Sequence, residues 1–241
     1  MEECLMARKP DALGEAGARR MAFQREHEYV SPRGLFDDVE PKGSRRFLTA
    51  AVAAFNGRGY HATTTRDIAT LAGSSPAGIY TYYATKADLL YEIAVIAHQY
   101  ILDETLAAVA SASDPIGRIS EIVRRSVTYH AEEHVLARVV NTDFRSLEVQ
   151  RLATIMKMRR QISRVVHDEV QRGVDLGVFH VAHVDGAAIA ILRLMDVAPW
   201  YNERGPMSPS ELAEVYLGLI LNMLRADRSD DGRDRDAAVN G

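Results

Sequence analysis

The sequence predicts an all-α protein with a small N-terminal helical domain and a larger helical domain after it. Apolar residues recur three and four positions apart along most of the chain, as on the buried face of a helix. Several of these runs begin with a Ser or Thr that precedes Pro or stands three residues before an acid, and both patterns mark helix starts. No segment alternates apolar and polar residues convincingly, so we expect no strand.

Composition limits the class of protein further. The 241 residues suffice to bury a real core, and Cys4 is the only cysteine, so a disulfide framework or a cysteine-based zinc site is excluded. No apolar run approaches the roughly 18 residues of a membrane span, and the N-terminus does not resemble a secretory signal. We therefore expect a cytoplasmic protein with no membrane partner.

The net charge of −4 is unevenly distributed along the chain. Residues 42–95 carry a local charge of +3, whereas the segments on both sides are acidic. The basic residues of this segment are Lys42, Arg45, Arg46, Arg58, Arg66 and Lys86, and the acidic ones are Asp67, Asp88 and Glu92. Such a segment favours contact with a polyanion only weakly, because a small basic segment is often just a solvated face.

The first elements follow from local signals. Residues 1–41 show no sustained periodicity, and we expect them to form a flexible N-terminal arm. The first amphipathic stripe, Phe47–Phe55, predicts a helix that ends at Gly57 or Gly59. Residues 42–95 then form a small domain of short helices that leads into a long one. Further helix starts are marked by Thr64 with Asp67, Ser75 with Pro76, and Thr85 with Asp88.

The centre of this domain has the spacing of a helix-turn-helix. Ala69, Gly73 and Ile79 are four and six residues apart. The first must be small where two helices cross, the second must be Gly where the turn needs a positive φ, and the third packs one helix on the other. Two core helices joined by a glycine turn fit the same residues. Lys86 favours a DNA-binding unit. The helix dipole disfavours a cation at a helix start, and this placement is explained if the Lys86 ammonium and the exposed N–H groups of the helix both point at a phosphate.

The rest of the chain is predicted to be helical as far as residue 226. Residues 227–241 are polar, and we expect them to form a disordered tail. The acidic balance of this part argues against DNA contact. Helices are expected within residues 115–134, 136–147, 149–174, 185–198 and 211–224.

Residues 44–95 closely resemble the DNA-binding domain of the TetR family of bacterial transcriptional regulators. The resemblance rests on the residue pattern in FLTAAVAAFNGRGYHATTTRDIATLAGSSPAGIYTYYATKADLLYEI. It implies a three-helix DNA-binding domain over residues 42–95 and a larger domain, residues 96–226, that binds a ligand and dimerises. The sequence departs from the family at Ser74, where an apolar residue is usual, and at Pro76, where many members have Lys.

The resemblance also implies which side chains face double-stranded DNA. One aromatic residue of this segment, Tyr83, is expected in the core beneath the second helix and not on the DNA-facing surface. Phosphate contacts fall on Thr64, Tyr80 and Lys86; base contacts fall on Ser75, Ala77, Gly78, Thr81 and Tyr82; Thr65 and Pro76 complete the surface.

The resemblance further implies a homodimer through helices 185–198 and 211–224. Its two recognition helices would lie about 34 Å apart and read a near-palindromic operator. A small, largely apolar effector would release the DNA, as in a repressor, although sequence alone leaves an activator open. The predicted ligand contacts are Tyr129, Phe144, Leu152, Ile155, Met156, Arg159, Met195 and Trp200, each of which fits an ordinary core position as well.

The C-terminal half resembles actinobacterial regulators of fatty-acid or sterol catabolism that respond to acyl-CoA thioesters. The similar segments are FRSLEVQRLATIMKMRRQISRVVHDEVQRGVDLGVF and APWYNERGPMSPSELAEVYLGLIL. By this resemblance the effector is an acyl-CoA, and Arg159 or Arg160 contacts the CoA phosphates.

The segment HAEEH, residues 130–134, suggests an alternative function. It matches the H-x-x-E-H pattern of zinc peptidases and places His130 and His134 one helical turn apart. Such an enzyme needs a third ligand, and nothing marks His180 or His183 as that ligand. A solvated helix end fits the same letters. We therefore expect a regulator with no catalytic activity, cofactor or metal, and a zinc hydrolase is the alternative.

Overall fold

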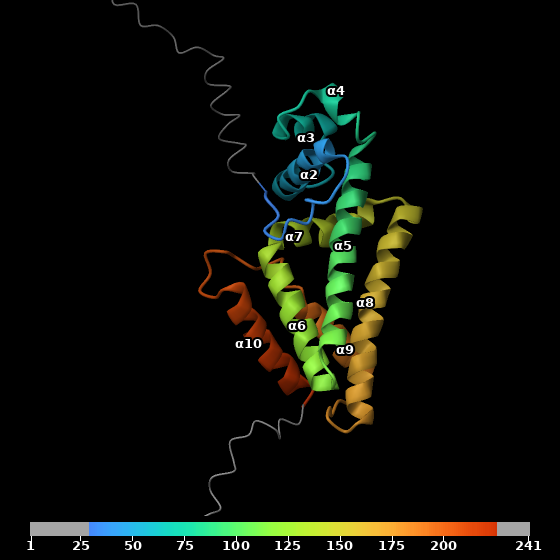
Figure 1. Ribbon diagram of the computed structural model, residues 1–241, viewed down its shortest axis with the longest axis vertical. Helices are drawn as coiled ribbons and strands as arrows, with labels where there is room; N and C mark the ends of the chain where they lie inside the picture. Colours follow the sequence, from blue (N-terminus) through green and yellow to red (C-terminus); the bar gives the residue numbers. More distant parts are fainter. Residues whose placement is uncertain (1–28, 226–241) are drawn as a thin grey trace, which may run out of the picture.

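Residues 29–225 are described by a computed structural model (Figure 1). Every regular element within this range is helical, which confirms the predicted all-α fold. The elements are η1 (Lys42–Ser44), α2 (Arg45–Arg58), α3 (Thr65–Leu71), α4 (Pro76–Ile79), α5 (Lys86–Ser111), α6 (Pro115–Glu132), α7 (His134–Asp143), η2 (Phe144–Ser146), α8 (Val149–Asp175), α9 (Val184–Met195) and α10 (Pro209–Met223).

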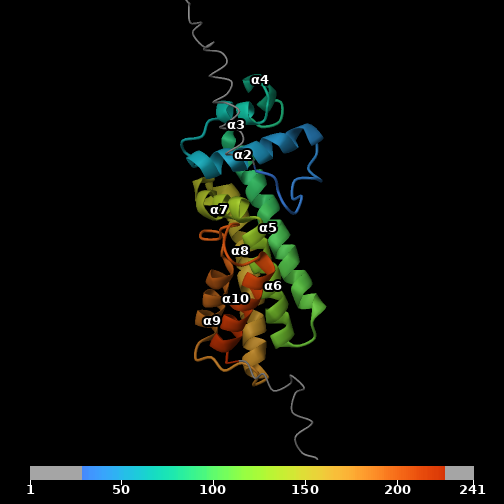
Figure 2. The ribbon, with the colours of Figure 1, turned by 90° about the vertical axis from the view of Figure 1, so that its left-hand side faces the viewer.

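The small domain of α2, α3 and α4 sits on the N-terminal end of α5 (Figures 1 and 2). Its core is formed by apolar side chains from all four helices, which are completely buried: Phe47, Leu48, Ile68, Ile79 and Leu89. Gly59 ends α2 with a φ of 79°, a conformation that glycine adopts without strain. Tyr83 is buried in this core, as predicted.

The larger domain is built on the long helices α5, α6 and α8, with α9 and α10 packed beside them (Figure 1). Helix α5 is long and apolar enough to cross a membrane by length and composition alone, a test that the core helix of a soluble protein also passes. Here it packs against α6, α7 and α8, and α7 lies beneath α2 (Figure 2). Helix α5 therefore extends from the small domain through the larger one.

Residues 29–41, which we call the N-terminal strap, pack on the junction between α6 and α7. The Glu133 carboxylate at this junction is completely buried and accepts three hydrogen bonds. The donors are the Tyr29 hydroxyl at 2.6 Å, the Ser31 hydroxyl at 2.5 Å and the Arg33 backbone N–H at 3.0 Å. These three donors supply the polar partners that a buried carboxylate requires.

The strap makes further contacts with the larger domain. The Arg33 guanidinium donates to Glu132 and to the Tyr100 hydroxyl, each at 2.6 Å, and Phe36 is buried. The prediction of a flexible arm over residues 1–41 is therefore wrong for residues 29–41. The sequence did not reveal these contacts, because the partners, Glu133 and Glu132, lie about a hundred positions away. Residues 1–28 and the predicted tail lie outside the described part of the chain.

Two helix boundaries also differ from the prediction. The helix expected over residues 115–134 ends at Glu132, because Glu133, with a φ of −95° and a ψ of 29°, interrupts the helical path before α7. The helix expected over residues 136–147 is α7 followed by the short η2. The predicted gap between these two helices, at residue 135, lies two residues from the observed break.

Candidate functional site

The helix-turn-helix has the geometry that its spacing predicts. Ala69 and Ile79 are completely buried where α3 and α4 meet. Gly73 has a φ of 64°, which favours glycine, and the Ser74 N–H donates to the Ala69 carbonyl at 2.8 Å to close the turn. The residues predicted to form the crossing, the turn and the packing contact therefore do so.

Helix α4 is a single turn whose exposed face is small. The Ser75 hydroxyl caps it by accepting from the Gly78 N–H at 3.1 Å, and Pro76 occupies the first helical position. A Cβ on Gly78 would lie 2.4 Å from the Ser74 hydroxyl oxygen, so a side chain at this position would displace Ser74. Five of the predicted DNA-facing residues are exposed on and after this turn: Ser75, Pro76, Ala77, Tyr80 and Thr81.

Tyr80 joins the exposed ends of α3 and α4. Its side chain is 57% exposed, and its hydroxyl lies 3.1 Å from the Thr65 hydroxyl. The Thr64 hydroxyl is instead held by its capping box, where it accepts from the Asp67 N–H and donates to the Asp67 carboxylate. Tyr80 and Thr65 therefore present a pair of ordered hydroxyls on the outer surface of the small domain.

Lys86 has an internal partner set that the sequence does not reveal. Its ammonium group donates to the carbonyls of Tyr60, His61 and Thr63 at 2.7, 3.0 and 2.8 Å, and it lies over the Tyr60 ring. An ammonium group has three N–H donors, and all three are used here. A phosphate contact by Lys86, which stays a prediction, would require it to exchange one of these carbonyls for DNA.

Tyr82 is also less free than the sequence predicts. Its ring is half-buried against Phe47, with the ring centroids 5.6 Å apart, and its hydroxyl crowds the Cβ position of Gly43. Exposed cations of the same domain that were not singled out as contacts are Lys42, Arg46, Arg58 and Arg66. The local positive charge of residues 42–95 is the sequence signal that could have identified these cations.

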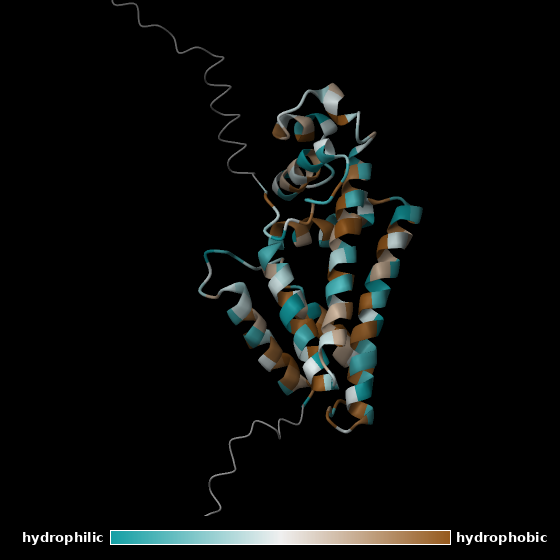
Figure 3. Cartoon of the chain, in the orientation of Figure 1, coloured by the Kyte–Doolittle hydropathy of each residue, from teal (hydrophilic) through white to brown (hydrophobic). Residues whose placement is uncertain are grey.

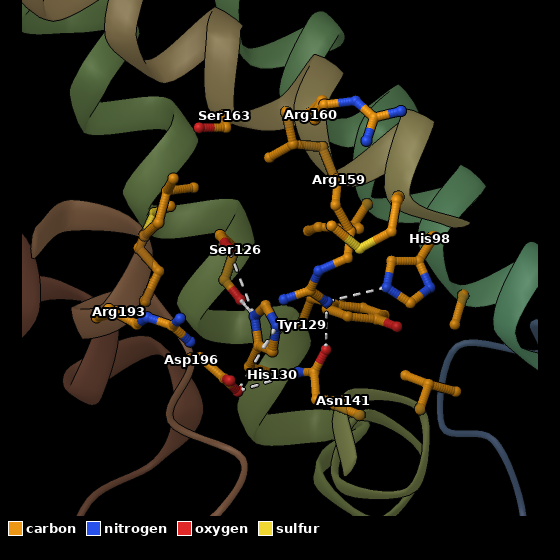
Figure 4. Close-up of a pocket in the computed structure, with 18 of the residues that line it drawn as sticks. His98, Ser126, Tyr129, His130, Asn141, Arg159, Arg160, Ser163, Arg193 and Asp196 are labelled. Carbon is orange, nitrogen blue, oxygen red and sulfur yellow. Dashed lines mark hydrogen bonds and ion pairs between the residues drawn. The ribbon is translucent and has the colours of Figure 1, made fainter. Parts of the chain in front are cut away.

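A cavity of about 300 Å³ lies inside the larger domain, between α5, α6, α7, α8 and α9 (Figure 4). Four of the eight predicted ligand contacts line it: Tyr129, Met156, Arg159 and Met195. Most of the surface that lines it is apolar, from residues such as Ile101, Val140 and Leu192, although eight of the other fifteen lining residues are polar or charged. This volume is at the lower end for sites that bind small molecules.

The other four predicted contacts lie outside the cavity. Phe144, Ile155 and Leu152 pack into the core shared with the small domain, where they support the neighbouring walls. Trp200 lies on the surface, 52% exposed, with its ring stacked on Tyr216. Their apolar character was correctly read, but helical position alone could not separate the core side of a helix from its cavity side.

A chain of polar side chains crosses the cavity wall (Figure 4). Nη1 of Arg159 donates to Oδ1 of Asn141 at 2.9 Å and to Nε2 of His98 at 3.1 Å. Because an arginine can only donate, the proton of His98 is on Nδ1, which bonds the Ala94 carbonyl at 2.7 Å. Asn141 in turn donates to Asp196 at 3.3 Å.

Burial keeps the cavity histidines neutral, and the lining arginines give the cavity a positive charge. Burial lowers the pKa of His98 to about 4, and the nearby Arg159 charge lowers this pKa further. Burial also lowers the pKa of His130, against the attraction of Asp196. Among the described lining residues, Asp196 is the one acid, whereas three arginines line the cavity: Arg159, Arg160 and Arg193. His98, Asn141 and Asp196 come from three separate helices or their ends, and no local motif could have identified them.

The pKa of His98 predicts a pH-dependent loss of stability. Its pKa is near 6.5 in the unfolded chain and about 4 in the folded one, so the unfolded chain binds the extra proton between these values. The free energy of unfolding should therefore fall as the pH is lowered from 6.5 towards 4, and His98→Gln should remove this part of the slope. Urea unfolding against pH measures it, with the half-exposed His167→Gln as control. Equal slopes in the wild type and His98→Gln would contradict the assignment.

The HAEEH side chains are not grouped as metal ligands in the part of the chain that the structure describes. Nδ1 of His130 bonds the Ser126 carbonyl and Nδ1 of His134 bonds the Ala131 carbonyl. Glu133, the acid of the H-x-x-E-H pattern, is buried beneath the strap and accepts three hydrogen bonds. Within residues 29–225 no three His, Cys, Asp or Glu side chains are grouped as metal ligands. The zinc hydrolase alternative therefore has no support.

Comparison with known families agrees with this two-domain geometry. Residues 47–93 match the model for bacterial regulatory proteins of the tetR family, and residues 112–224 match the tetracyclin repressor-like C-terminal domain. The chain is 29% identical over 188 residues to the HTH-type transcriptional repressor KstR2 of Mycobacterium tuberculosis, covering 74% of this chain and 92% of that protein.

Solved structures show the same fold. A bacterial regulatory protein of the tetR family from Rhodococcus RHA1 is 34% identical, with a TM-score of 0.73, and the match covers 77% of this chain and 98% of that one. AibR, solved in complex with isovaleryl coenzyme A and operator DNA, is 16% identical with a TM-score of 0.69, covering 77% and 100%, and shows the fold alone. The chain therefore belongs to the TetR family of bacterial transcriptional regulators and binds DNA through its helix-turn-helix.

Proposed function

We propose that the protein is a cytoplasmic repressor that binds a near-palindromic operator as a homodimer and leaves the DNA when an effector enters the cavity. The observation that carries this proposal is the continuity of α5. It begins at Lys86, directly after the helix-turn-helix, and contributes Ala97, His98 and Ile101 to the cavity. A ligand that moves α5 would shift the recognition helices, which weakens operator binding by the coupling free energy, typically about 1–3 kcal/mol.

We propose an acyl-CoA thioester as the effector. The apolar walls suit an acyl chain, but a cavity of about 300 Å³ is too small for the whole of CoA as well. Arg160 and Arg193 are exposed lining residues, and their guanidinium groups would supply the cations that CoA phosphates need outside the cavity. This class is supported by AibR, a fold relative that was solved in complex with isovaleryl coenzyme A.

The homodimer is proposed on the outer faces of α9 and α10. Ile189, Val215 and Leu219 are 59%, 48% and 51% exposed, and they are the largest apolar side chains that these two helices leave open. Figure 3 shows hydrophobic residues along much of α10 at the edge of the domain. A face of this kind commonly marks a protein interface.

Substitution of Tyr80 tests the DNA surface. Tyr80→Phe should lower operator affinity several-fold and leave the slope of log affinity against log salt nearly unchanged, because the exposed hydroxyl beside Thr65 is neutral and only cationic side chains release counterions from the phosphates. Fluorescence anisotropy with operator DNA at several salt concentrations measures both values. Tyr91→Phe, on α5 under the Arg151 guanidinium, is the matched control. If Tyr80→Phe and Tyr80→Ala both bind the operator as the wild type does, Tyr80 does not contact the DNA.

The effector class is tested in the same assay. Adding an acyl-CoA should release the labelled operator, whereas free CoA should not. If acyl-CoA thioesters from short chains to steroid acids all leave operator binding unchanged, this effector class is wrong, although the DNA-binding role would stand.

A further inference from the structure

Arg159 has hydrogen-bonding capacity that the surrounding protein does not use. Nη1 is occupied by Asn141 and His98. Nε and Nη2 carry three more N–H donors, and no hydrogen-bond partner for them lies within residues 29–225. The guanidinium reaches into the space bounded by Ser126, His130 and Asn141 (Figure 4).

No carboxylate within the described chain forms an ion pair with this guanidinium. Asp196 is the nearby acid, and Asn141 stands between the two, bonded to Asp196 at 3.3 Å and to Arg159 at 2.9 Å. Burial lowers the pKa of Arg159 against the attraction of Asp196, and the Arg193 and Arg145 charges lower it further. The guanidinium also lies over the Phe144 ring. A partly buried guanidinium with free donors is the group that proteins use to bind a carboxylate in bidentate fashion.

The other two cavity arginines are placed differently. Arg160 and Arg193 are exposed, whereas Arg159 is held inside by His98 and Asn141. His98 is neutral and can accept from Arg159 only while it stays so, which fixes Nη1 and turns the free donors towards the cavity. The site thus has two exposed cations, Arg160 and Arg193, and one inner cation, Arg159.

We propose that the effector carries a second anionic group, a carboxylate at the far end of its acyl chain, which pairs with Arg159 inside the cavity. This inference rests on the proposed acyl-CoA effector. The outer arginines would meet the CoA phosphates, the apolar walls the hydrocarbon, and Arg159 the terminal carboxylate. The cavity therefore selects acyl groups that carry the CoA thioester at one end and a free carboxylate at the other. His98 and Asn141 are positioning residues for Arg159.

Matched ten-carbon thioesters test this selection. Sebacoyl-CoA ends in a carboxylate and decanoyl-CoA ends in a methyl group, so their difference isolates the inner end of the chain. Calorimetry on the wild-type protein should show that sebacoyl-CoA binds at least about tenfold more tightly than decanoyl-CoA. Arg159→Met should remove the preference and leave decanoyl-CoA binding nearly unchanged. Arg160→Met, at an exposed position, should weaken both thioesters alike.

The possible outcomes separate the inference from the proposed function. Equal binding of both thioesters by the wild type overturns the inference and leaves the acyl-CoA effector in place. If neither thioester binds but free sebacic acid binds the wild type and not Arg159→Met, the carboxylate site stands and the CoA part is wrong. If none of the three binds, both are overturned. Arg159→Lys, which keeps the charge without the planar fork, should retain part of the preference and serves if Arg159→Met does not fold.

Discussion

Glu133→Leu should destabilise the protein by about 3–5 kcal/mol, because it leaves three buried hydrogen-bond donors unpaired at roughly 1–3 kcal/mol each. The carboxylate is completely buried and accepts from the Tyr29 hydroxyl, the Ser31 hydroxyl and the Arg33 N–H. Leucine can accept from none of them, so three donors would be left without a partner beneath the strap. Urea unfolding measures the loss as a lower midpoint.

A matched substitution at the neighbouring position separates burial from charge. Glu132 also bonds the strap, through Arg33, but its side chain is 35% exposed, so Glu132→Gln should change stability by less than about 1 kcal/mol. Tyr29→Phe should fall between them, because it removes one donor and leaves the carboxylate two. If Glu133→Leu is no less stable than Glu132→Gln, the strap is not held by this carboxylate.

Loss of the strap should also be visible locally. Burial raises the pKa of the Tyr29 phenol, and the adjacent Glu133 charge raises it further. In Glu133→Leu the strap should separate from α6 and α7, and its backbone amides should exchange with solvent faster than in Glu132→Gln. The strap leads directly into η1 and α2, so it connects the α6–α7 junction with the small domain.

The parts of the fold that the sequence predicted well depend on neighbouring residues. The capping boxes at Thr64 and Thr85 and the proline start at Ser75 are formed as predicted, because their partners lie three residues away. The turn at Gly73 follows from a backbone requirement that one residue type satisfies best. Local signals of this kind identify both the helix-turn-helix and the family.

The parts that the sequence could not predict depend on contacts across the chain. The strap is held by a carboxylate about a hundred residues away, and the carbonyls around Lys86 come from the loop after α2. HAEEH contains that carboxylate, yet its pattern suggests a metal site, because five letters do not show which neighbours surround them. The polar chain of the cavity likewise joins α5, α7, α8 and the end of α9, which no periodicity relates.

Leu219→Arg should convert the protein to a monomer and lower its operator affinity by more than about a hundredfold. In the proposed homodimer a two-fold axis relates the α9 and α10 faces, so one substitution places two arginines against apolar surface. A charge buried there without a partner costs several kcal/mol. A dimer binds both half-sites in one step, whereas a monomer must bind each separately and loses the gain of effective concentration.

Leu106→Arg is the matched control for this experiment. Leu106 lies on α5 and is 50% exposed, against 51% for Leu219 on α10, so the two substitutions change surface chemistry equally at different faces. Sedimentation equilibrium should show a dimer for Leu106→Arg and a monomer for Leu219→Arg, with single half-site binding alike in both. A monomeric wild type, or a dimeric Leu219→Arg with full operator affinity, would place the interface elsewhere. Because Ile189 belongs both to the cavity lining and to the exposed apolar face, a dimer formed there would join the effector site of each protomer to the contact that sets the spacing of the recognition helices.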